Sequence, residues 1–210
     1  MSLLREYIRE LLTESIDPKI MSMIDRAEEL GLRGFVKDGY AAVYDPTIDV
    51  SKYYDGYVGS VNRVAGVSYN PRPGAHGQPC SAAREVSVSG SKDFGMGPLA
   101  YDLAIEASGG LMSDRLEVSD EARAVWDYYL NSRSDVRSSQ LDNEIDDLTP
   151  GLEDDNCLQS SARVVPGQRR VPSASSGDLA WAESSLSKVY RKTGTPVMDE
   201  LRRRNMLDEK

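Results

Sequence analysis

The sequence predicts an α/β fold in which a mixed central sheet is flanked by helices. Residues 85–130 carry the main evidence, because strand and helix patterns follow one another there in the order strand, glycine-rich turn, helix, strand, helix. A hairpin pattern over residues 34–44 adds strands ahead of this unit. The 210 residues suit one domain with extensions, and we place that domain at residues 17–136.

Residues 1–16 are expected to form an N-terminal amphipathic helix or leader. Leucine, isoleucine and tyrosine occupy one face of a helix over residues 3–12, while arginine and glutamate occupy the other. Such a helix either packs on its own domain or docks on another protein, and the sequence leaves both alternatives open.

A second helix is expected from Pro18 to about residue 30. Asp17 is a favourable N-cap, proline suits the first helical turn, and Gly31 suits the position that follows the last one. The chain then enters the hairpin, whose arms are residues 35–36 and 40–44.

Further strands are expected before residue 90. Tyrosine and valine recur at short intervals over residues 53–69, which predicts one or two strands. Residues 70–79 are rich in proline and glycine and predict a loop. This loop leads into a strand in which Val86 and Val88 alternate with serine.

The break after that strand is predicted to bind an anion. Gly95 and Gly97 allow the backbone to turn its N–H groups outward, because no Cβ is in the way. Pro98 begins a helix, whose first turn adds free N–H groups and the positive end of the helix dipole. Together these features suit a pyrophosphate.

The helix from Pro98 is expected to end at Gly109, where two glycines follow one another. A short buried strand is expected at residues 111–112. Ser119 is a favourable N-cap for the next helix, which has acidic residues in its first turn and ends near Asn131.

The composition after residue 136 changes. Residues 137–177 are expected to be an acidic and flexible connection, since seven acidic residues fall between 142 and 155 without a basic one, and proline, glycine and serine follow. Residues 178–210 are expected to be a helical extension, with one helix around residues 179–190 and another from Pro196 to about Met206.

Charge and residue usage exclude several classes of function. A formal net charge of −9 argues against a general nucleic-acid binder and against binding to anionic lipid surfaces. No apolar run approaches the ~20 residues of a membrane span. His76 is the single histidine, so a multi-histidine metal site cannot be built and we predict no metal. Cys80 and Cys157 form no C-x-x-C motif, which fits a cytosolic environment.

The spacing Lys92-x-x-Gly95-x-Gly97 resembles the coenzyme-A pyrophosphate loop of the GNAT family of N-acetyltransferases, in which glutamine or arginine usually stands where this chain has lysine. The order of elements over residues 85–130 is similar to the second half of that fold. The resemblance implies a GNAT-like domain and acetyl-CoA as co-substrate. It also implies that backbone N–H groups from Phe94 through Met96 to Gly97 hold the phosphates, with Lys92 adding charge.

The same resemblance implies two catalytic residues. The final helix of GNAT proteins often carries Ala-x-x-x-Tyr, and residues 124–128 supply that spacing. Tyr128 would therefore be the general acid near the sulfur. Glu85, on the strand before the loop, would be the candidate base, acting directly or through water.

Residues 97–106, 110–115 and 118–136 are also similar to a group of proteins encoded by tailed bacteriophages, which share GPLxYDxAxE, GLxSDR and VSxxAxxVWDYYxxxRSDV. The first 14 residues look like the leaders of some tailed-phage proteins, and residues 12–14 match a Leu-x-Glu cleavage signal. The resemblance implies a location in the host cytoplasm or the virion, and phage virion proteins as partners of the N-terminal helix.

Three hypotheses on function follow. The first is transfer of acetyl from acetyl-CoA to an unidentified amine, on a small molecule or a protein. The second is a catalytically inactive GNAT-like virion or accessory protein that binds other phage or host proteins. The third is an inhibitor of a host enzyme or defence, because acidic proteins can mimic nucleic acid.

Overall fold

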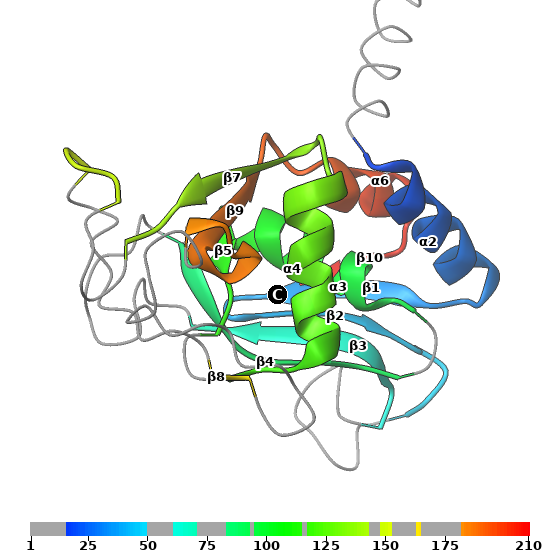
Figure 1. Cartoon of the computed structure of the whole chain (residues 1–210). Coiled ribbons are helices and arrows are strands. Elements are labelled where there is room, and N and C mark those ends of the chain that lie inside the picture. Colours follow the sequence, from blue (N-terminus) through cyan, green and yellow to red (C-terminus); the bar gives the residue numbers. More distant parts are fainter. Residues whose placement is uncertain are drawn as a thin grey trace, which may run out of the picture.

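The computed structural model describes residues 16–49, 61–70, 83–92, 95–114, 117–142, 148–152, 163–164 and 182–210. Within these ranges the fold is mixed α/β: an eight-stranded curled sheet and four α-helices (Figure 1). The helix expected over residues 3–12, the tyrosines at 53–57, and Phe94 lie outside the described residues.

The strands of the large sheet have this spatial order: β10 (Leu207–Glu209), β1 (Arg33–Lys37), β2 (Tyr40–Tyr44), β3 (Arg63–Tyr69), β4 (Arg84–Ser91), β5 (Leu111–Met112), β9 (Lys188–Lys192) and β7 (Val136–Gln140). The helices are α2 (Pro18–Glu29), α3 (Gly97–Ser108), α4 (Asp120–Ser132) and α6 (Pro196–Arg203). A 3-10 turn, η3 (Ser185–Ser187), precedes β9, and β6 (Glu117–Val118) pairs with β8 (Arg163–Val164) apart from the large sheet.

Strands β1 to β4 form an antiparallel meander, whereas β4 and β5 run parallel and are joined by α3. The parallel contact is short: Arg84 pairs with Leu111 and Glu85 with Met112. Beyond this point, residues 86–91 of β4 pair with β3 alone among the described strands. The contact between β4 and β5 therefore ends after residue 85. Helices α3 and α4 cover the sheet on this face (Figure 1).

The predicted caps and the hairpin are confirmed. The Asp17 carboxylate accepts from the backbone N–H groups of Lys19 and Ile20 at 2.9 and 3.3 Å. Ser119 Oγ accepts from the N–H of Ala122 at 3.2 Å. Gly109 ends α3 at φ 73°, a left-handed conformation that favours glycine.

The prediction of a helix over residues 179–190 is wrong at its end. Residues Ser185–Ser187 form one 3-10 turn, and Lys188–Lys192 form β9, which lies between β5 and β7 and is antiparallel to both. The predicted helix from Pro196 is confirmed as α6, and β10 beyond it pairs in parallel with β1. Strands β7, β9 and β10 were not expected, because each is short and its pairing partners are distant in sequence.

A buried ionic cluster joins this last part of the chain to α3. Lys192 Nζ lies 2.8 Å from Glu106 Oε1 and 3.0 Å from Asp102 Oδ2. The guanidinium of Arg133, which is fully buried, lies 2.8 Å from Asp102 Oδ2. Glu106 also accepts from the N–H groups of Val197 and Met198 at 3.0 and 2.8 Å. Because no side chain of α6 caps its own start, Glu106 on α3 takes that role.

A second ionic contact closes the other edge of the sheet. The Arg33 guanidinium on β1 donates two bonds to Asp208 on β10, at 2.7 and 2.9 Å, and the Tyr44 hydroxyl donates to the same carboxylate at 2.6 Å. The bond from Arg33 lowers the pKa of Asp208 although partial burial acts in the opposite direction.

The variant Asp208→Asn is expected to lose about 1 kcal/mol of stability at pH 7, because one charged and bidentate contact is lost at a partly exposed site. A carboxyl whose folded-state pKa is lowered stabilises the fold above the unfolded value of ~3.9, and this contribution disappears as the pH falls through the folded-state value. Urea unfolding at pH 7 and pH 3 should therefore show a difference from wild type that shrinks in acid. A difference that stays constant with pH would contradict this account.

Candidate functional site

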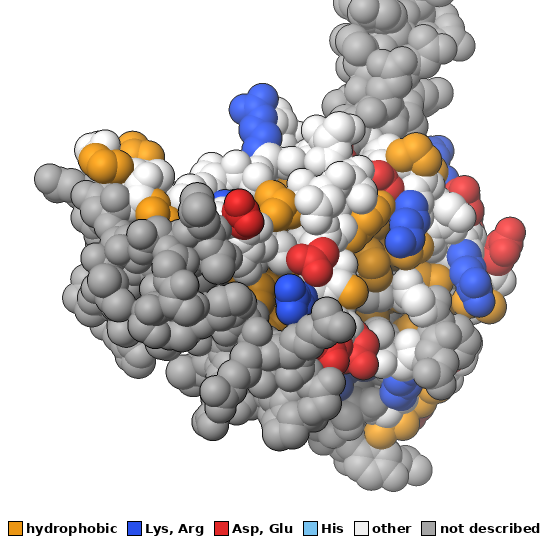
Figure 2. Space-filling view, in the orientation of Figure 1, with side chains coloured by type: hydrophobic (Ala, Val, Ile, Leu, Met, Phe, Trp, Pro, Cys, Tyr) orange, Lys and Arg blue, Asp and Glu red, His pale blue; other side chains and the backbone are white. Residues whose placement is uncertain are grey.

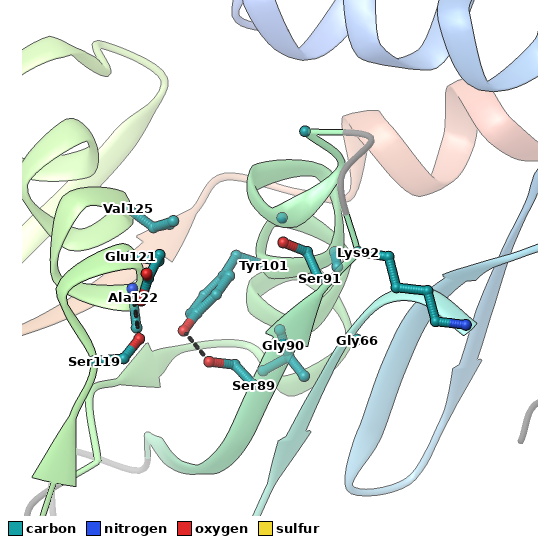
Figure 3. Close-up of a pocket in the computed structure, with 14 residues that line it drawn as sticks. Gly66, Ser89, Gly90, Ser91, Lys92, Tyr101, Ser119, Glu121, Ala122 and Val125 are labelled. Atoms are coloured by element: carbon teal, nitrogen blue, oxygen red, sulfur yellow. Dashed lines mark hydrogen bonds between the residues drawn. The ribbon is translucent and has the colours of Figure 1, made fainter. Parts of the chain in front are cut away.

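Two adjoining cavities lie between β4, the start of α3 and the first turns of α4, with volumes of about 530 and 300 Å³. The larger extends from the turn before α3 to the first turns of α4, and the smaller continues along β4 toward Asp114. They share Ser89, Tyr101, Ser119 and Ala122 in their walls. We call the two cavities together the groove, and Figure 3 shows its larger part.

A β-bulge shapes the floor of the groove. Val88 is opposite Ser68 and Val86 is opposite Tyr69, so Ser87 is an extra residue in β4. The extra residue reverses the alternation of side chains along the strand. Val86 can therefore enter the hydrophobic core while Ser89 faces the same side of the sheet and lines the groove.

Tyr101 lies at the junction of the two cavities. Its hydroxyl donates to Ser89 Oγ at 2.8 Å (Figure 3). Its ring meets Trp126 edge-on with centroids 5.1 Å apart. Burial raises the pKa of Tyr101 to about 12, and the bond to Ser89 only partly opposes this effect. The phenol is therefore protonated at neutral pH and is held in a fixed orientation.

The turn before α3 forms one end of the groove. Gly95 adopts φ +67°, and a Cβ at Gly97 would meet only Ser91 Oγ, at 3.8 Å. The Met96 side chain is fully buried, and it anchors the turn while its neighbours line the cavity. The N-cap residue of α3 is Met96, whose side chain makes no capping hydrogen bond. The polar start of this helix is therefore available to a ligand in the groove.

Lys92 lines the larger cavity, but its amine points elsewhere. The Nζ atom donates to the carbonyl of Val61 at 2.9 Å, and Figure 3 shows the side chain extending away from Tyr101. A phosphate is a stronger acceptor for an ammonium than a carbonyl is. Lys92 would therefore have to exchange its partner in order to contribute charge to the groove.

The two residues predicted to be catalytic lie apart from the groove walls. Glu85 is 8% exposed and sits where β4 pairs with β5, and it lines neither cavity. Tyr128 is on α4, but its hydroxyl donates to Asp17 Oδ1 at 2.6 Å, and Lys19 lies over its ring. Burial raises the pKa of Tyr128, and Asp17 acts in the same direction. Their catalytic roles remain predictions.

Sequence reasoning missed Tyr101, Ser89 and Ser119 as groove residues. One signal for Tyr101 was present in the sequence. It stands four positions after Gly97, so one helical turn places both residues on the same face of α3. Ser89 gave no such signal, because its direction depends on the bulge at Ser87.

Comparisons with models of protein families, with curated proteins and with solved structures found no match. The class of protein is therefore defined by its structure alone: a mixed α/β protein with a groove between β4, α3 and α4. Among the described residues, no helix has the length and apolar character that crossing a membrane requires. The same part of the chain holds no group of three or more residues that could bind a metal ion.

The surface carries charges of both signs. Figure 2 shows lysine and arginine side chains interspersed with aspartate and glutamate over the described part of one face. Several surface charges of the described residues are paired, for example Arg204 at the end of α6 with Asp25 and Glu28 of α2, each at 2.7 Å. Paired and mixed charges contribute little long-range attraction for a highly charged partner.

Proposed function

We propose that this protein is a GNAT-like N-acetyltransferase that transfers an acetyl group from acetyl-CoA to an unidentified amine, either on a small molecule or on a protein. The observation that carries the proposal is the position of the groove. It lies against the part of β4 that extends beyond the pairing with β5, with the glycine turn and the start of α3 at one end.

The topology supports the proposal. A cleft beside Gly95 and Gly97, between parallel strands that separate, is the geometry that the resemblance to GNAT proteins implies. Two features of the described strands support it: β5 pairs with β4 in parallel at only two positions, and α3 connects them. The bulge at Ser87 adds to this support, since bulges are frequent next to active sites.

The groove also meets the main chemical requirements for a thioester of a nucleotide. The pyrophosphate would lie against the backbone of residues 95–97 and the start of α3. The chain that carries the thioester would then run along β4, past Ser91 and Ser89, toward the smaller cavity. The acceptor amine would enter from the Asp114 end, where a carboxylate favours a cation.

The second candidate is a GNAT-like virion or accessory protein without activity. Two observations favour it. The Lys92 amine is bound to a backbone carbonyl, and both Glu85 and Tyr128 lie outside the groove. Such a protein would act through its surface, in the phage particle or the host cytoplasm. Mass spectrometry of purified particles tests it, and absence from particles counts against a virion role.

Titration with acetyl-CoA is the direct test of the enzyme proposal. We expect wild-type protein to bind acetyl-CoA, measured by calorimetry and by a rise in melting temperature. The variant Ser91→Tyr places a ring in the larger cavity from an exposed strand position and should weaken binding at least tenfold. Ser139→Tyr on β7, equally exposed and outside the groove, is the matched control. No binding by wild type at millimolar acetyl-CoA would reject the proposal.

A further inference from the structure

Tyr101 is the phenol that the groove presents at its midpoint. Its side chain forms part of both cavities, so a ligand extending from the glycine turn into the smaller cavity must pass it. The hydroxyl already holds one polar partner, Ser89 Oγ at 2.8 Å, and both atoms face the groove (Figure 3).

The other hydroxyl at this junction already has partners on its own helix. Ser119 Oγ accepts from the N–H of Ala122 at 3.2 Å and caps α4, and its hydroxyl bonds to the carboxylate of Glu121. Ser89, by contrast, can reverse its role, since a serine hydroxyl both donates and accepts. If Ser89 donates to the phenol oxygen, Tyr101 is left free to donate its own proton to a ligand atom in the groove.

We infer that Tyr101 is a catalytic residue whose hydroxyl donates a hydrogen bond to the sulfur of the bound thioester and stabilises the thiolate as it departs. This inference rests on the proposed function. It gives the contact with the sulfur to a residue of α3 inside the groove, whereas the resemblance implied Tyr128 near the sulfur, and the hydroxyl of Tyr128 is held by Asp17 at 2.6 Å.

The reaction balances as follows. The amine lone pair attacks the thioester carbonyl carbon, and the C–S bond breaks with its electron pair going to sulfur. The sulfur leaves as a thiolate that accepts a hydrogen bond from Tyr101, and the proton lost by the amine passes to water, which in turn protonates the released thiolate at neutral pH. The charged groups that line the two cavities are Asp114, whose charge helps to keep the phenol protonated, and Lys92 and Glu121 in the larger one.

The test is an equilibrium measurement that needs no acceptor. A thiol has a pKa of ~8.5, so free coenzyme A is mostly thiol at pH 7 and thiolate at pH 10. Tyr101 remains protonated at pH 10 because its pKa is about 12. We expect the affinity of wild type for coenzyme A, relative to desulfo-coenzyme A, to rise about tenfold from pH 7 to pH 10, the size of one hydrogen bond to a charged group.

In Tyr101→Phe this rise should fall below about twofold, because the phenyl ring keeps its packing but cannot donate. Tyr44→Phe loses a similar hydroxyl bond, to Asp208 and outside the groove, and should keep the wild-type response. Calorimetry gives each dissociation constant, and melting curves at both pH values check that each variant is folded.

The outcomes separate the two proposals. If wild type binds no coenzyme A at either pH, the proposed function fails and the inference fails with it. If wild type binds and Tyr101→Phe keeps the full rise, Tyr101 is not the sulfur partner while the proposed function stands. Ser89→Ala adds a measurement without removing the phenol: the rise should persist or increase, and its loss would also overturn the inference.

Discussion

Replacement of Lys192 by methionine is expected to lower the free energy of unfolding by about 3–5 kcal/mol. The lysine side chain is 1% exposed and lies within 3.0 Å of carboxylate oxygens of both Asp102 and Glu106. The two acids outweigh the effect of burial and raise the pKa of Lys192, so the amine is charged throughout the neutral range. Without it, Asp102 still pairs with Arg133, but the buried Glu106 carboxylate loses the lysine that compensates its charge.

Urea unfolding measures the loss, with Lys37→Met as the control. Lys37 is an exposed lysine of β1, and its replacement should change stability by less than about 0.5 kcal/mol. The double variant Lys192→Met with Glu106→Gln should recover part of the loss, because the uncompensated charge is reduced. A loss below about 1 kcal/mol for Lys192→Met would mean that the cluster is better hydrated than its burial indicates.

Trp126→Ala is expected to cost about 3–5 kcal/mol, the range for removal of a large buried aromatic side chain. Trp126 is 1% exposed and lies at the centre of an aromatic cluster. Its ring centroid lies 5.1 Å from Tyr101, 5.1 Å from Tyr190 and 6.1 Å from Tyr129. Its removal would leave a cavity between α3, α4 and β9 that these rings cannot fill without moving.

The same variant should disturb the groove, since Trp126 orients Tyr101 and lines the smaller cavity. Chemical unfolding gives the stability, and near-ultraviolet circular dichroism reports the loss of fixed aromatic packing. Leu130→Ala, at a half-buried position of the same helix, should cost less than half as much and is the control. Equal losses in the two variants would contradict a special role for the tryptophan.

Local signals predicted much of the fold. Asp17, Ser119 and Gly109 were recognisable as helix ends because each makes its cap with residues close to it in sequence. The hairpin of β1 and β2 was recognisable for the same reason. Of the residues predicted for the anion site, Lys92, Gly95 and Gly97 line the groove, and their role in binding an anion stays a prediction.

Long-range pairing was the part that the sequence could not indicate. Leu186, Val189 and Tyr190 recur at helical spacing, yet residues 188–192 form a strand because β5 and β7 offer it partners on both sides. Ser89 faces the groove only because β4 contains an extra residue opposite β3. The conformation of residues 188–192 depends on strands more than 40 residues away, and the direction of Ser89 depends on strand register. Neither leaves a local pattern in the sequence.

The position of β9 has a consequence for synthesis. A nascent chain leaving the ribosome cannot seat β5 and β7 in their finished sheet until residues 188–192 have emerged, because that strand lies between them. Strand β10 fills the far edge later still. This side of the sheet can therefore be completed only after residue 192 has emerged, and until then the β9-facing edges of β5 and β7 expose unpaired backbone groups that other chains can pair with.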